Sequence, residues 1–154
     1  MQPDARLAQQ VLDVQPFSAW LAPKVRHFES GAVEIELPCR GELTQHHGYV
    51  HGGVVSALAD LAMAFAGGSV LGDVLTSEFK VSFVRPALGE SVIARGRVLH
   101  AGRRQATAEA LVFVVRDGAE LLVAVALGTI VSATGSAPPM LPLPDVITSD
   151  GTLP

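Results

Sequence analysis

The charged residue that most needs a chemical explanation is Asp60, which lies in the middle of a long apolar segment. Between His51 and Gly72 the chain contains no other Asp, Glu, Lys or Arg. A carboxylate in apolar surroundings is costly unless it is paired, hydrogen-bonded or used in a reaction. Because no cation lies in the same segment, we favour a catalytic role for Asp60, as a nucleophile or as the general base that activates water, over a structural one.

A second chemical feature is the glycine pair Gly52–Gly53, which stands where the same segment begins. A helix N-terminus presents unpaired N–H groups and a positive dipole end, and a glycine lets a carbonyl oxygen approach them closely. The Gly52 amide is therefore a candidate for polarising a carbonyl, although both glycines also suit a tight turn. We expect His51 to fix the adjoining loop through its ring nitrogens. A zinc site with His46 or His47 lacks a cysteine or carboxylate to complete it, so we predict no metal.

The apolar segment itself predicts a buried helix over about residues 52–67. Apolar residues recur there at the spacing i, i+3, i+4, i+7, and the remaining positions are mostly Ala, Val or Met. The eight positions from Gly52 to Asp60 correspond to about 12 Å of helix rise, too far for both to reach one reacting carbon. We therefore expect antiparallel helices of two chains to place Gly52 of one subunit opposite Asp60 of the other, with a homodimer as the minimal active unit.

Alternation of apolar and polar residues predicts strands on both sides of this helix. The expected strands are 33–37 before the helix, and 75–83, 90–99, 104–115 and 121–131 after it. Glycines and prolines separate them, and Asp117–Gly118 is typical of a tight hairpin turn. We therefore predict an α+β fold in which a curved antiparallel sheet wraps around a long central helix.

The length and punctuation of the chain indicate one domain over residues 1–131. A short helix is expected over about residues 4–13, with Asp4 as its cap and Pro16 as its stop, followed by a connection over residues 16–23. The tail over residues 132–154 holds five of the ten prolines, and we expect it to be mobile or loosely packed.

Composition narrows the class of partner. The formal net charge is -4 and no basic run occurs, so nucleic acid is not an expected partner. Asp60 and several glycines interrupt the apolar stretch 50–71, so we expect no membrane span. The single cysteine, Cys39, excludes an intrachain disulfide and has no evident activating partner, and no signal-peptide pattern follows Met1. We expect a cytoplasmic protein with an inert thiol.

Several of these residues together match a known pattern. The spacing of Gln45, His51–Gly52–Gly53, Asp60, Thr76 and the run Phe83–Ala87 resembles the hotdog-fold acyl-CoA thioesterases of the phenylacetic-acid-pathway (PaaI-like) type. The resemblance covers roughly residues 16–131. It implies hydrolysis of an acyl-CoA to free acid and CoA by a homodimer, with further association to a homotetramer and no cofactor beyond the CoA of the substrate.

The resemblance also implies roles for two residues that the apolar helix does not contain. Gln45, where the family usually has Asn or Gln, would help to place the water or the thioester. Thr76, where Ser or Thr is usual, would hold the water beside Asp60, although an ordinary strand threonine is the alternative.

An acyl-CoA would need binding residues for the phosphates of the coenzyme and for the acyl group. Arg85, Arg103 and Arg104 lie at strand ends or in a turn, where guanidinium groups can meet phosphates, with a merely solvated role as the alternative. Four apolar residues are candidates for the acyl pocket, with core packing as the alternative: Met63, Phe65, Trp20 and Leu21.

Two other functions stay open at this point. A hotdog hydratase or dehydratase uses an Asp with a His five residues further on, and no Asp here is followed by His at that distance. A non-catalytic acyl-CoA binding module would bind the same ligand without hydrolysing it.

Overall fold

The computed structural model describes residues 4–133, so nearly all of the tail predicted over 132–154 lies outside the described residues. Three α-helices, one short 3₁₀ helix and six strands occur in the described part. The helices are α1 (Ala5–Val14), α2 (Pro16–Leu21), η1 (Gly41–Leu43) and α3 (Gly52–Leu71). The strands are β1 (Lys24–Glu29), β2 (Ala32–Pro38), β3 (Val74–Phe83), β4 (Ser91–Ala101), β5 (Gln105–Arg116) and β6 (Ala119–Ser132).

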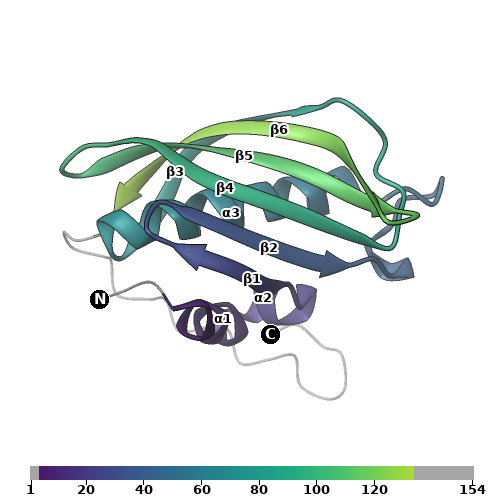
Figure 1. Ribbon diagram of the computed structural model, residues 1–154, viewed down its shortest axis with the longest axis horizontal. Helices are drawn as coiled ribbons and strands as arrows, with labels where there is room; N and C mark the ends of the chain where they lie inside the picture. The colour runs from purple at the N-terminus through teal and green to yellow at the C-terminus, as the bar shows by residue number, and fades with distance from the viewer. Residues whose placement is uncertain (1–3, 134–154) are drawn as a thin grey trace, which may run out of the picture.

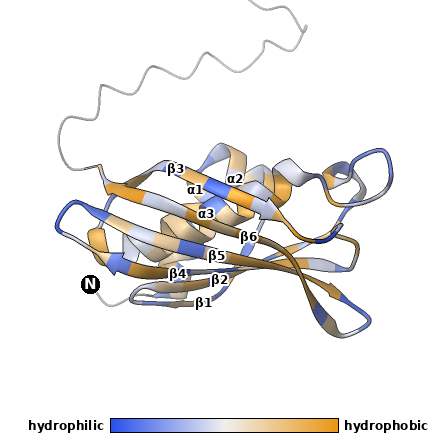
Figure 2. Ribbon diagram, turned by 90° about the horizontal axis from the view of Figure 1, so that it is seen from above, coloured by the Kyte–Doolittle hydropathy of each residue, from blue (hydrophilic) through white to orange (hydrophobic). Residues whose placement is uncertain are grey.

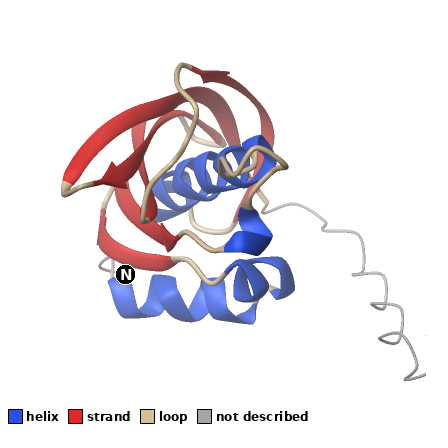
Figure 3. Ribbon diagram, turned by 90° about the vertical axis from the view of Figure 1, so that its right-hand side faces the viewer, coloured by secondary structure: helices blue, strands red, loops and turns tan. Residues whose placement is uncertain are grey.

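The six strands form one antiparallel sheet in the order β1-β2-β4-β5-β6-β3. The sheet curves, and α3 lies in its concave face, as the end-on view of Figure 3 shows. Figure 1 shows the same arrangement from the side, with α1 and α2 beneath β1. The predicted α+β architecture, a curved antiparallel sheet around a long central helix, is confirmed.

Helix α3 buries seven of its residues, because it is apolar on nearly all sides and the sheet surrounds it. It ends at Leu71, four residues beyond the predicted 52–67, with Gly72 as its C-cap, so the pair Gly67–Gly68 lies inside the helix rather than at its end. A Cβ at Gly67 would lie 2.7 Å from Cγ2 of Ile130. The glycine is therefore required by the close packing of α3 on β6. By length and composition, α3 is also the one helix in the described chain that could span a membrane.

Strands β2 and β5 bury alternate residues as predicted, whereas β4 begins with four consecutive buried residues. In β2, Val33, Ile35 and Leu37 are buried in the core that also contains α3. The predicted hairpin turn joins β5 to β6 and has positive φ at both Asp117 and Gly118, as a tight turn between twisted strands requires. Figure 2 shows hydrophobic positions along the strands and α3, and hydrophilic positions in the turns at the strand ends.

Strand β3 departs from strict alternation at Ser77. Its pairing with β6 shifts between Thr76 and Glu78, so Ser77 is an extra residue, a β-bulge. Thr76 and Phe79 consequently both point toward the helix, although they are three residues apart. The alternation predicted over 75–83 would place Leu75 on the same face as Phe79, and this is wrong, because Leu75 precedes the bulge and is 65% exposed.

Two elements near the N-terminus are absent from the predicted set. The stretch 16–23, predicted as a connection, contains α2, because Pro16 not only ends α1 but also suits the first position of a new helix. Strand β1 is short and mostly exposed, so it shows no two-residue period. The Gln9 side chain of α1 secures it by accepting from the N–H of Val25 at 2.8 Å and donating to the carbonyl of Pro23 at 3.1 Å.

Candidate active site

Helix α3 begins at a histidine cap. The Nδ1 atom of His51 accepts a hydrogen bond from the N–H of Gly53 at 2.9 Å. The backbone N–H of His51 donates to the carbonyl of Leu43 at 2.8 Å. The ring and the backbone of His51 therefore fix the junction of loop and helix, which is the structural role expected of this residue.

Gly52 is the first residue of α3, and within residues 4–133 its N–H donates to no acceptor. A free N–H at this position lies at the positive end of the helix dipole. A Cβ at Gly52 would lie 3.3 Å from Cζ of Phe83, so the phenyl ring lies beside the helix start. Because glycine has no side chain, no Cβ shields the free N–H at this position.

The loop between β2 and α3 brings Gln45 to the same place. The N–H of Val50 donates to the carbonyl of Ala87 at 2.9 Å, and the N–H of Gln45 donates to the carbonyl of Tyr49 at 2.8 Å. The side-chain oxygen of Gln45 accepts from the N–H of His47. Since this oxygen is engaged, the side-chain NH₂ of Gln45 is the end that can donate to a bound group.

These residues line a cavity of about 510 Å³ at the N-terminal end of α3, here called the Gly52 cavity. Its lining residues are Gln45, Tyr49, Val50, Gly52, Val55, Phe83, Val84, Arg85, Pro86, Ala87 and Val123. Arg85 donates to the carbonyl of Leu122 at 3.1 Å, stays exposed, and is the one cation in the lining. Two neutral donors and one cation form a donor set that suits a carbonyl oxygen close to an anion.

Asp60 lies two turns further along α3, on the face toward β3. The hydroxyl of Thr76 donates to Oδ1 of Asp60 at 2.6 Å, and the Ser77 bulge is what turns Thr76 toward the helix. None of the ion pairs in the described part of the chain involves Asp60. Among the described residues, one hydroxyl therefore holds the carboxylate through Oδ1.

A single chain does not bring Asp60 to Gly52. The two residues are separated by about 12 Å of helix rise, and Asp60 does not line the Gly52 cavity. The predicted residues instead form two half-sites. One consists of Gln45, Gly52 and Arg85 around the Gly52 cavity, and the other consists of Asp60 and Thr76 between α3 and β3.

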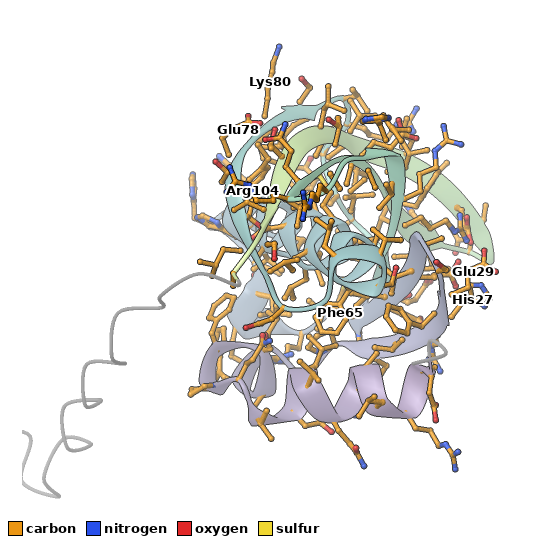
Figure 4. The ribbon with its side chains drawn as sticks, turned by 90° about the vertical axis from the view of Figure 1, so that its left-hand side faces the viewer. His27, Glu29, Phe65, Glu78, Lys80 and Arg104 are labelled. Atoms are coloured by element: carbon orange, nitrogen blue, oxygen red, sulfur yellow. The ribbon has the colours of Figure 1, made fainter. Side chains whose placement is uncertain are left out.

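The remaining predicted substrate-binding residues lie apart from both half-sites. Arg103 and Arg104 are exposed at the turn between β4 and β5, and Figure 4 shows Arg104 on the sheet side of the molecule, away from Phe65. Met63 is completely buried in the hydrophobic core and does not line the Gly52 cavity. Core packing accounts for its position.

The structure also locates the residues considered for metal binding and thiol chemistry. No group of three His, Cys, Asp or Glu side chains that could hold a metal occurs within residues 4–133, and the rings of His46 and His47 lie 3.9 Å apart in an exposed loop. Burial raises the pKa of the Cys39 thiol, and the nearby charge of Glu90 raises it further. The thiol is thus protonated at neutral pH and is a poor nucleophile.

Two residues of the Gly52 cavity, Tyr49 and Phe83, have no predicted role from the sequence. Tyr49 closes the loop through its carbonyl, and the ring of Phe83 lies beside Gly52. Tyr49 does stand in the polar loop before the helix, and Phe83 stands two residues before Arg85. Their involvement depends on contacts between β3 and the loop, which are distant in sequence.

Comparison with known proteins links this site to one family. The thioesterase superfamily matches residues 47–121 of the chain, a range that contains His51, Gly52, Asp60 and Thr76. A protein of Halobacterium salinarum named "Putative esterase" is 32% identical over 124 residues, which cover 75% of this chain and 82% of that protein.

Solved structures are similar over most of their length. A thioesterase family protein from Silicibacter pomeroyi has a TM-score of 0.79 and 35% identity, covering 82% of this chain and 96% of that one. A mutant of the phenylacetic acid degradation protein PaaI from Thermus thermophilus has a TM-score of 0.68 and 32% identity, covering 77% of this chain and 99% of that one. Both the fold and the sequence therefore agree with the predicted family.

Proposed function

Because this chain belongs to the thioesterase superfamily and has the hotdog fold of its PaaI-type members, we propose that it hydrolyses acyl-CoA thioesters to a free acid and CoA. The observation that carries the proposal is the pair Asp60–Thr76. A carboxylate on an apolar helix, held by one hydroxyl and with no ion-pair partner in the described chain, is suited to attack a carbonyl or to activate water.

In the proposed reaction the thioester carbonyl oxygen accepts hydrogen bonds from the N–H of Gly52 and the NH₂ of Gln45. Asp60 either takes a proton from a water held by Thr76, which attacks the carbonyl carbon, or attacks that carbon itself. Direct attack forms a mixed anhydride that water then opens. In both routes the C–S bond breaks, its electron pair leaves with the CoA sulfur, the sulfur takes up a proton, and the acyl carbon ends bonded to oxygen from water.

A homodimer is the proposed active unit, because each chain holds the two half-sites about 12 Å apart. A difference between the two edge strands of the sheet, β1 and β3, supports a homodimer. Strand β1 is six residues long, largely charged and packed against α1, whereas β3 is ten residues long and exposes Leu75 and Phe83. A long unblocked edge is a template for a second chain. Antiparallel association around β3 would set Gly52 of one subunit opposite Asp60 of the other.

The cation of the Gly52 cavity is proposed to bind the coenzyme. Arg85 is the one cation in the lining and is exposed, so its guanidinium can pair with a CoA phosphate, which the pantetheine arm carries away from the thioester. Arg103 and Arg104 stand at a separate turn and are proposed only as a more distant phosphate contact.

The test is release of free thiol from acetyl-, butanoyl-, octanoyl-, dodecanoyl- and benzoyl-CoA by the wild type, Asp60→Asn and a control, Asp117→Asn. Asp117 is exposed in the β5–β6 turn, where asparagine tolerates its positive φ. Release that is lost in Asp60→Asn and kept in Asp117→Asn, with unchanged thermal unfolding, supports the proposal. Full release by Asp60→Asn contradicts the role of Asp60. Tight binding of acyl-CoA by the wild type without any release indicates a binding module instead.

A further inference from the structure

A second cavity, of about 530 Å³, lies at the C-terminal end of α3, between this helix and α1. We call it the α1–α3 cavity. Residues of α1 such as Leu7 and Val11 form one wall, and Ala64, Phe65 and Gly68 of α3 form the opposite wall. Its volume falls within the roughly 300–1,000 Å³ of small-molecule sites. None of the residues that line it belongs to the Gly52 cavity.

The lining of the α1–α3 cavity begins at Ala64, one turn of α3 beyond Asp60, and Asp60 does not line the cavity itself. Asp60, Ala64 and Gly68 are spaced i, i+4, i+8 and so lie on one face of α3. This face is directed toward β3 at both ends: Asp60 accepts from Thr76, and a Cβ at Gly68 would lie 3.4 Å from Cγ2 of Val74. Since Ala64 and Gly68 carry little or no side chain, α3 itself places no large side chain at these positions of the face, over the approximately 12 Å of helix rise from Asp60 to Gly68.

The chemistry of the lining is that of a hydrocarbon site. The rings of Phe28 and Phe65 form an edge-to-face pair with centroids 6.3 Å apart, and Figure 4 shows Phe65 between α3 and α1. On α1, Leu7 and Val11 are 42% and 43% exposed, so the wall is apolar yet open to solvent. Apolar surface exposed to water in this way favours an apolar ligand.

The charged residues of the α1–α3 cavity are acidic only. Asp4 and Asp73 line it, and no Lys, Arg or His does. Asp4 is paired with Arg6 at 3.5 Å, whereas Asp73 has no ion pair among the described residues. An acyl group that ends in a carboxylate would meet like charge here.

We propose that the α1–α3 cavity receives the acyl chain of the substrate, with the thioester carbon at Asp60. The proposal rests on the proposed thioesterase function and deepens it. The acyl groups that fit have an uncharged hydrocarbon tail long enough to reach from Asp60 past Ala64, where the lining of the cavity begins. Leu7 and Val11 are then specificity-determining residues. Short acyl groups do not reach the cavity and are insensitive to it.

The test fills the cavity from its exposed wall. Leu7→Trp and Val11→Trp place a large ring in it, and Val14→Trp is the matched control, because Val14 lies on the same helix, is 78% exposed and does not line the cavity. We expect kcat/KM for octanoyl- and dodecanoyl-CoA to fall at least about tenfold in the two cavity variants, equal to about 1.4 kcal/mol. For acetyl- and butanoyl-CoA it should stay within about twofold, and Val14→Trp should resemble the wild type.

Equal effects on all chain lengths, or an effect of Val14→Trp as large as that of Leu7→Trp, would overturn the proposal. A change in molecular mass in Leu7→Trp and Val11→Trp without any chain-length effect would also overturn it, and would identify the cavity as a contact between copies of the chain. Calorimetric binding of 1-decanol, which carries no charge, to the wild type and to Leu7→Trp separates this proposal from the proposed function. If no acyl-CoA is hydrolysed, calorimetric binding to the wild type but not to Leu7→Trp still supports a hydrocarbon site in the α1–α3 cavity. Equal binding to both proteins, or binding to neither, rejects that site.

A second experiment tests the acidic lining with dodecanoyl-CoA and dodecanedioyl-CoA, which have the same chain length and differ in a terminal carboxylate. We expect the wild type to prefer dodecanoyl-CoA, and Asp73→Asn to reduce that preference at least about threefold. Asp4→Asn should act in the same direction while keeping the N-cap of α1, since asparagine caps helices as well as aspartate does. An unchanged preference in both variants would remove the acidic residues from the proposal.

Discussion

Replacement of Gly52 by proline tests the proposed carbonyl donor with little disturbance of the fold. Proline removes the N–H of residue 52 and is favoured at the first position of a helix, which Gly52 occupies. A residue before proline must be extended, and His51 already has φ -59 and ψ 136. The cap of α3 is kept, because His51 accepts from Gly53 rather than from Gly52.

The expected loss follows from the number of donors. Gly52 and Gln45 are the two donors proposed to face the thioester oxygen, and loss of one oxyanion donor typically lowers kcat by about 10²–10³, or about 2.7–4 kcal/mol. Gly52→Ala is the control, since it adds a Cβ at the same place but keeps the N–H. That Cβ would lie 3.3 Å from Cζ of Phe83, whose side chain is exposed and has room to shift, so we expect Gly52→Ala to lose less than about tenfold.

The assay is free-thiol release at saturating octanoyl-CoA, with thermal unfolding of both variants measured in parallel. The proposed role of the Gly52 N–H is refuted if Gly52→Pro unfolds at the wild-type temperature and its kcat lies within about threefold of that of Gly52→Ala. Loss of one oxyanion donor should lower kcat by much more than threefold. Equal losses in both variants would mean that the added Cβ, rather than the missing N–H, limits the reaction.

Three further predictions concern the Asp60 half-site, the helix start and the sheet surface. Thr76→Val removes the hydroxyl that donates to Asp60, so kcat should fall at least about tenfold while KM changes little. Thr76→Ser keeps a hydroxyl and should retain most of the wild-type kcat. Equal kcat values for Thr76→Val and Thr76→Ser would contradict the role of the hydroxyl. His51→Ala removes the N-cap of α3 and should lower the free energy of unfolding by about 1 kcal/mol, whereas His51→Asn should retain most of it in urea denaturation. The Arg95 guanidinium holds the pKa of Glu120 below its usual 4.5. This carboxylate therefore stabilises the fold above pH 4.5 and loses that effect as the pH falls below it, so the stability difference between wild type and Glu120→Gln should shrink from pH 7 to pH 3; a constant difference would exclude this linkage.

The elements that the sequence predicts well are those with a strong local signal. The central helix follows from its continuous apolar composition, β2 follows from strict alternation, and the β5–β6 hairpin follows from the pair Asp117–Gly118. Each of these signals acts within a few residues of the chain, so neighbours in space are not needed to read them.

The elements that the sequence does not predict are those whose stability comes from distant partners. Strand β1 has no alternation of its own and is secured by Gln9 of α1. The sequence predicts the end of α3 near Gly67–Gly68, but the helix continues through them, and Gly67 allows the close packing against β6. Glycine inside a helix is unfavourable by propensity alone, and close contact between elements overrides that preference.

The sequence by itself determines which chemical groups are present: one acid, Asp60, in an apolar helix, and a glycine with a free N–H at the start of that helix. Which residues lie beside these two groups depends on the tertiary structure. Thr76 reaches Asp60 because a one-residue bulge changes the face of β3, and Arg85 joins Gly52 because Val50 bonds to Ala87. Both depend on strand register and on contacts between segments far apart in sequence, and such contacts leave no local period to read.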